Sequence, residues 1–112
     1  YIGLELAQSI YSISLDLKPT GFTKNYNSDV GAVAKKDLKA GEKLDGEGGF
    51  CARGKLISSQ KSKEDGILPL GLTDNAIVKR NIKRDELIKL SDVDLDLPKE
   101  VLEAREYQYN LI

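Results

Sequence analysis

The sequence predicts a mainly β domain with two similar β-hooks, preceded by an N-terminal helix and followed by a short C-terminal helix. Three observations support this. Residues 2–15 have helical periodicity, short β-branched runs separated by glycine follow residue 30, and a segment within those runs is repeated. The 112 residues suit one domain, and 40% hydrophobic with 31% charged residues is an ordinary globular composition.

Residues 2–15 form the predicted N-terminal helix. Its polar side chains share one face, and apolar side chains fill an arc of about 220° around the rest. One neighbouring layer of structure covers only a little more than about 100° of a helix, so this helix needs partners on two sides. A strand over residues 13–17 is the alternative. We expect copies of the chain to associate through four apolar residues of the helix: Ile2, Leu6, Ile10 and Ile13.

An internal repeat predicts the two hooks. Residues 32–44 recur as residues 76–88, an offset of 44, and of thirteen aligned pairs four are identical and six exchange like for like. Two copies are too few for a solenoid, so they indicate a pseudo-two-fold domain. In each copy an apolar strand leads to a basic kink and then to a turn before an acidic residue. We expect equivalent burial within two pairs of positions: Val33 with Ile77, and Leu38 with Ile82.

Local signals predict the turns and the C-terminal elements. Gly41 is free to take a positive φ, and Asp85, at the equivalent place in the second hook, tolerates that conformation better than most residues. Residues 60–66 are polar and predict an exposed loop. Residues 92–97 alternate acidic and apolar side chains, which predicts a terminal strand with a solvated acidic face. Pro98 then begins the short C-terminal helix.

The composition excludes several classes of function. Without His there is no Ser-His or Cys-His nucleophile pair and no His-ligated zinc. Cys51 is the one cysteine, which excludes an intrachain disulfide, and we expect it to be a small buried hydrophobe. A net charge of −1 argues against nucleic acid as a partner.

The sequence also bears on location and completeness. No apolar run approaches the ~20 residues that span a bilayer, so we expect no membrane partner and a cytoplasmic location. The chain has neither Met nor a signal segment. We therefore expect a domain fragment that begins in mid-sequence.

The glycine-rich segment 45–55 is the candidate site. Three glycines in four positions open the backbone to close approach, and neighbouring side chains supply both signs of charge. The candidate contacts for a ligand or another domain are Asp45, Gly46, Glu47, Gly48, Gly49, Arg53 and Lys55. The alternative is a loop that turns a sharp corner with its charges in water. We expect no catalytic residue, and two carboxylates without further ligands do not indicate a metal site.

The repeat and the segments after it resemble a known family. The hook VAKKDLKAGE at residues 33–42 and its echo resemble the SAF domain, a β-clip module of sialic acid synthases, type III antifreeze proteins and flagellar assembly chaperones. The segments LDGEGGF at 44–50, GKL at 54–56 and LPLGL at 68–72 resemble the C-terminal SAF domain of homoserine-dehydrogenase-like NAD(P)-binding oxidoreductases. Residues 1–5 are similar to the segment that leaves their catalytic domain.

The resemblance implies a β-clip fold and three parts. Residues 1–28 are a connecting helix and linker from an N-terminal catalytic domain, residues 29–97 are the SAF-like domain, and residues 98–112 are a tail. The chain is then a non-catalytic module that contributes interdomain or ligand contacts and is inactive alone. We expect no cofactor in this chain, and NAD(P) in the parent protein's catalytic domain, because no G-x-G-x-x-G follows a strand here. The alternatives are a free-standing binding module for a sugar acid or similar small anionic metabolite, and an assembly-chaperone-like protein.

Overall fold

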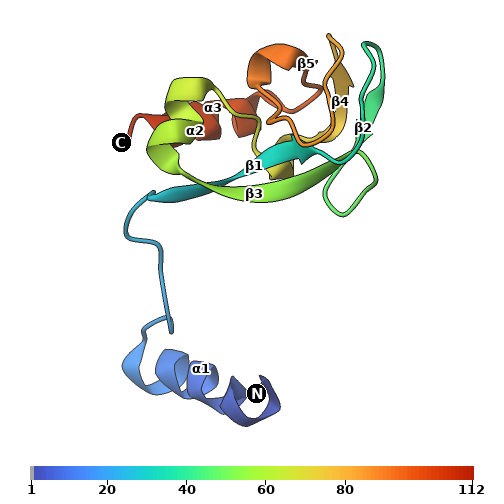
Figure 1. Cartoon of the computed structure of the whole chain (residues 1–112). Helices are drawn as coiled ribbons and strands as arrows, with labels where there is room; N and C mark the ends of the chain where they lie inside the picture. The colour runs from blue at the N-terminus through green and yellow to red at the C-terminus, as the bar shows by residue number, and fades with distance from the viewer. Residues whose placement is uncertain (1) are drawn as a thin grey trace.

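The computed structural model describes residues 2–112 and places helices at both ends of a core built from strands (Figure 1). The order is α1 (Ile2–Asp16), β1 (Ser28–Ala34), β2 (Lys43–Asp45), β3 (Ala52–Ser58), α2 (Ser59–Asp65), η1 (Leu70–Leu72), β4 (Asp74–Val78), η2 (Leu90–Asp92), β5 (Val93–Asp94) and α3 (Lys99–Tyr109). Two small antiparallel sheets and the helices make the chain mixed α/β, where the sequence predicted mainly β.

The two sheets are built from short strands. β1 and β3 pair over their whole length, from Ser28 opposite Ser58 to Ala34 opposite Ala52. The second sheet has the order β2-β4-β5, so its central strand comes from the second hook and one edge strand from the first. The hooks are thus joined by strand pairing as well as by the core.

Leu38 and Ile82 join the two hooks at equivalent positions of the repeat. They form an isolated antiparallel bridge. The Leu38 N–H donates to the Ile82 carbonyl at 2.7 Å, and the Ile82 N–H donates to the Leu38 carbonyl at 2.9 Å. Both side chains are 1% exposed and belong to one buried cluster. The two hydrogen bonds are reciprocal, so interchanging the two hooks reproduces the same pair of bonds. A two-fold axis between the hooks requires this.

The turns of the hooks obey the same symmetry. The Gly41 N–H donates to the Val78 carbonyl at 2.7 Å, and the equivalent Asp85 N–H donates to the equivalent Ala34 carbonyl at 2.8 Å. The φ angles of Gly41 and Asp85 are 91° and 68°, which confirms the two sharp turns. Each turn therefore closes on the strand of the other hook.

Side chains at a second pair of equivalent positions hold the turns. The Ala40 N–H donates to Asn81 Oδ1 at 3.0 Å, and the equivalent Arg84 N–H donates to Asp37 Oδ1 at 2.8 Å. Both acceptors reach across from the opposite hook, over 41 and 47 residues of sequence respectively. The predicted repeat is thus confirmed in its hydrogen bonds, and the exchange of Asp for Asn preserves the carboxyl or amide oxygen that does this work.

Ile77 departs from the predicted symmetry. Val33 is 1% exposed, but its equivalent Ile77 is 37% exposed. The last four residues of β1 are all buried, so that strand is covered on both faces, whereas β4 alternates and buries Ala76 and Val78 on one face. The expectation of equal burial was wrong for this pair because, in the part of the chain that the structure describes, the second face of β4 is open to solvent at Ile77.

Residues 60–66 also differ from the prediction. They lie in α2 and its cap rather than in an exposed loop. The Ser58 hydroxyl accepts a hydrogen bond from the Lys61 N–H at 3.2 Å, which caps the start of the helix, and Gly66 ends it with a φ of 60°. The side chain of Ser62 is fully buried. The polar composition concealed a short helix that has two buried polar positions, Ser59 and Ser62.

The predicted acidic strand is reduced to the two residues of β5, and Asp92 lies before it in η2. Asp92 is buried and accepts hydrogen bonds from Arg80 Nε at 2.7 Å and from the Lys89 N–H at 3.0 Å. Burial raises the pKa of Asp92, but the Arg80 guanidinium outweighs it, and the net result is a lowered pKa. The prediction of a solvated acidic face was wrong at this residue because a paired arginine lets the carboxylate be buried.

The terminal helices confirm two predictions. α3 begins at Lys99 directly after Pro98. α1 covers the predicted residues, ends at Asp16 and contains no buried residue. An extended segment joins it to β1 (Figure 1). Within residues 2–112 no helix is both long enough and apolar enough to cross a bilayer.

Candidate functional site

The glycine-rich segment is organised by Asp45. Its carboxylate accepts hydrogen bonds from the Phe50 N–H at 2.7 Å and from the Cys51 N–H at 3.0 Å. The hydrogen bond from Phe50 and, to a smaller extent, the one from Cys51 lower the pKa of Asp45 to about 2. A Cβ at Gly49 would overlap the Asp45 carboxyl group, so a side chain there would displace this group from its hydrogen bonds. Asp45 and Gly49 therefore both contribute to closing the loop.

The charged residues near this loop point to solvent. Glu47 and Lys55 are exposed, and the Arg53 guanidinium lies 3.3 Å from the Asp85 carboxylate in the second hook. None of the seven predicted contact residues lines either of the two hollows described below. Their contact with a ligand or another domain stays a prediction. Cys51 is buried as predicted, and burial raises the pKa of its thiol.

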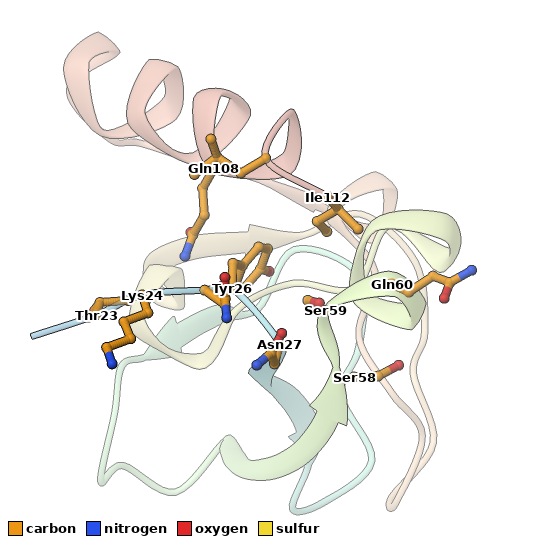
Figure 2. Close-up of a pocket in the computed structure, with 11 residues that line it drawn as sticks. Thr23, Lys24, Tyr26, Asn27, Ser58, Ser59, Gln60, Gln108 and Ile112 are labelled. Carbon is orange, nitrogen blue, oxygen red and sulfur yellow. The ribbon is translucent and has the colours of Figure 1, made fainter.

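A hollow of about 600 Å³ lies at the other end of the β1–β3 ribbon. Figure 2 shows it between three segments: residues 23–27 before β1, the start of α2, and the C-terminal end of α3. Neutral amide and hydroxyl side chains dominate its wall, and Lys24 adds one positive charge. The amide and hydroxyl residues include Thr23, Asn25, Asn27, Ser58, Ser59, Gln60 and Gln108.

A second hollow of about 540 Å³ is more apolar. It lies between the start of β1, η1 and α3, and its wall includes Val30, Leu72 and Val101. Gln108 lines both hollows, so α3 forms part of the wall between them. Asp29 and Arg105 line the second hollow.

A cluster of polar side chains is centred on Asp29. Its Oδ2 accepts hydrogen bonds from the Tyr26 hydroxyl at 2.9 Å, from the Ser62 hydroxyl at 2.7 Å and from the Arg105 guanidinium. Its Oδ1 accepts the Val30 N–H at 2.9 Å. The side chains of Asp29 and Arg105 are only 11% and 14% exposed. Burial at this level is tolerable because the two charges are paired and both carboxylate oxygens of Asp29 accept hydrogen bonds.

Aromatic rings enclose the guanidinium of Arg105. Its central carbon lies 5.5 Å from the centroid of the Tyr26 ring and 4.5 Å from that of Tyr109, distances at which a cation is attracted to a ring face. One Arg105 nitrogen also donates to Ser62 Oγ at 3.3 Å. Arg105 Nε and the Tyr109 hydroxyl are buried and have no hydrogen-bond partner among the described residues.

No sequence pattern indicated this cluster. Asp29 lies 33 residues from Ser62 and 76 from Arg105, and no periodicity connects these positions. Asp29 was predicted to lie at a linker boundary, Ser62 in an exposed loop and Arg105 in a tail. Within residues 2–112 no group of three or more acidic, His or Cys side chains is placed to hold a metal ion.

A comparison with protein families gives a match over both hooks and the segment between them. The family model described as SAF domain matches residues 29–94, which run from the second residue of β1 to the end of β5. A comparison with curated proteins finds no match. The matched range includes Asp29 and Ser62, whereas α1 and α3 lie outside it.

Proposed function

Because the chain belongs to the SAF domain family, we propose that it is a non-catalytic module of a homoserine-dehydrogenase-like NAD(P)-dependent oxidoreductase. In this proposal it docks on the catalytic domain through α1 and contributes interdomain contacts. The interlocked hooks support the finer assignment of a β-clip. A SAF domain is an accessory or binding unit, and no part of the proposal requires chemistry in residues 2–112.

The exposed surface of α1 carries the proposal. All seven of its large apolar side chains, from Ile2 to Leu15, are between 57% and 88% exposed. Leaving each one in water costs about 1.5–3 kcal/mol relative to burial. Contiguous apolar surface of this kind is typical of a protein–protein contact. Within residues 2–112 the rest of the structure leaves these side chains exposed, so we infer that another polypeptide covers them.

The resemblance suggests which polypeptide this is. Residues 1–5, at the start of α1, are similar to the segment that leaves the catalytic domain in these oxidoreductases. The chain itself does not fit NAD(P), since residues 46–49 connect two strands and do not open a helix after a strand. We therefore assign any dinucleotide to the catalytic domain, where it would supply or accept a hydride, and no step to this chain.

A binding experiment tests the proposal. The purified chain is titrated with a separately expressed catalytic domain of a homoserine-dehydrogenase-like oxidoreductase, and binding is measured by calorimetry. We expect saturable binding that an Ile10→Glu, Ile13→Glu double variant weakens by at least about tenfold, or about 1.4 kcal/mol. The matched control is Leu56→Glu, which changes an exposed apolar residue on β3 and should leave the affinity unchanged. Absence of binding, or equal loss in the control, would reject docking through α1.

A second candidate function is favoured by the hollow in Figure 2. Amide and hydroxyl side chains suit a polyhydroxylated ligand, and Lys24 suits a carboxylate on it. This supports the alternative of a module that binds a sugar acid or similar anion, although through residues other than Arg53 and Lys55. Titration with glucuronate should then shift the amide resonances of residues 23–27, and Lys24→Gln should weaken the binding. Shifts of the amide resonances of residues 45–55 instead would indicate that the ligand binds at the glycine-rich loop.

A further inference from the structure

We propose that Tyr26, Asp29 and Ser62 form a binding site for an alkylguanidinium group, and that Arg105 of α3 occupies this site as a displaceable internal ligand. The external ligand would be the side chain of an arginine, supplied by a partner polypeptide or by the free amino acid. This inference is independent of docking through α1 and of the hollow in Figure 2.

The hydrogen bonds that hold Tyr26, Asp29 and Ser62 together do not depend on Arg105. Asp29 is the second residue of β1 and Ser62 lies on α2, so both belong to the SAF domain, and their hydrogen bond of 2.7 Å does not involve α3. The Tyr26 hydroxyl donates to the same carboxylate oxygen. These two donors and the Val30 N–H leave a largely buried negative charge unpaired unless a cation is present.

The geometry favours a guanidinium over an ammonium. The occupant donates to both Asp29 and Ser62 from one nitrogen and to Gln108 Oε1 from a second nitrogen at 2.9 Å, and its central carbon lies 5.5 Å from the centroid of the Tyr26 ring. A planar group with several fixed donors meets these demands together, whereas an ammonium is a compact, strongly hydrated charge that does not stack. The site is therefore specific for the shape of the cation as well as for its charge.

The internal ligand is weakly held. α3 contains no buried residue, and its apolar residues Val101 and Leu102 are partly exposed. Besides the contacts of Arg105, α3 is joined to the body of the domain, among the described residues, by a hydrogen bond from Lys63 Nζ to the Tyr109 carbonyl at 2.9 Å. Arg105 Nε is buried with no acceptor, which is unfavourable for the docked state. An external arginine that satisfies this donor can therefore displace α3.

The test removes the internal competitor. N-acetyl-L-argininamide, which resembles an arginine within a polypeptide, is titrated into the full-length Arg105→Ala variant and into the wild type, and the Asp29 and Ser62 amide resonances are followed. We expect saturable binding to the variant and at least about tenfold weaker binding to the wild type, because the internal ligand acts at a high effective concentration. N-acetyl-L-lysinamide is the matched probe and should bind more weakly than the arginine compound.

Three results would overturn the proposal: no saturable binding to Arg105→Ala, binding that survives in an Arg105→Ala, Asp29→Asn double variant, or equal affinity for the wild type and Arg105→Ala. Titration with free L-arginine distinguishes the sources, since tighter binding of the blocked compound indicates a polypeptide and tighter binding of the amino acid indicates a metabolite. A second measurement uses the wild type, should Arg105→Ala fail to fold. Saturating argininamide should then accelerate hydrogen exchange in α3 and leave β1 unchanged, and unchanged exchange in α3 would reject displacement.

Discussion

Truncation of Leu38 should be among the most damaging substitutions in this chain. Leu38→Ala removes three carbons from a fully buried side chain at the contact between the hooks. At roughly 0.8 kcal/mol per buried carbon group the transfer cost is about 2.4 kcal/mol, and the cavity left behind brings the total to about 3–4 kcal/mol. A domain of this size has about 5–15 kcal/mol of stability in all. The pseudo-two-fold relation predicts the same cost for Ile82→Ala.

Ile77→Ala is the matched control for this prediction. It also deletes three carbons, but the side chain is 37% exposed, so we expect a loss of about 1–1.5 kcal/mol. Urea unfolding followed by far-UV circular dichroism and tyrosine fluorescence gives the free energy of unfolding for each variant. Equal losses for Leu38→Ala and Ile77→Ala, or losses for Leu38→Ala and Ile82→Ala that differ by more than about 2 kcal/mol, would refute the reasoning.

Two further predictions concern single groups, and a third concerns the activity of the whole chain. The pKa of Asp45 is lowered to about 2, below that of an unfolded aspartate near about 3.9. Its carboxylate thus stabilises the fold above about pH 4 and loses this effect as the pH falls towards 2. In urea unfolding measured at several pH values, Asp45→Asn should therefore reduce the loss of stability at acid pH. An unchanged loss would contradict this. Burial raises the pKa of Cys51, so a disulfide reagent should modify it only as the protein unfolds, and rapid modification of the native chain would be inconsistent. The purified chain should show no NAD(P)-dependent turnover of homoserine or related metabolites above background in an absorbance assay.

The hooks could be predicted from the sequence because their determinants are local and occur twice. Buried positions such as Leu38 and Ile82 recur as apolar residues at a fixed offset, and the turns recur at Gly41 and Asp85, which tolerate positive φ. What the repeat does not reveal is that the copies interlock. The hydrogen bond from Arg84 to Asp37 crosses between hooks, and nothing in either copy specifies a partner in the other.

The polar cluster could not be predicted because its residues meet only after folding. Asp92 was expected to face water, since its neighbours alternate, and its partner Arg80 lies 12 residues away in another segment. Asp29 and Arg105 lie still farther apart in the chain. In the glycine-rich segment the sequence identified an unusual backbone, but it did not show that Asp45 uses both carboxylate oxygens to close its own loop.

Sedimentation velocity of the isolated chain tests most directly whether α1 is an interaction surface. In the absence of its partner, the helix should hide its apolar side chains against the same helix of another copy. We expect the wild type to self-associate as its concentration rises and the Ile10→Glu, Ile13→Glu double variant to sediment as a monomer at every concentration. If the wild type also remains monomeric throughout, at the same sedimentation coefficient as the double variant, α1 is not an interaction surface.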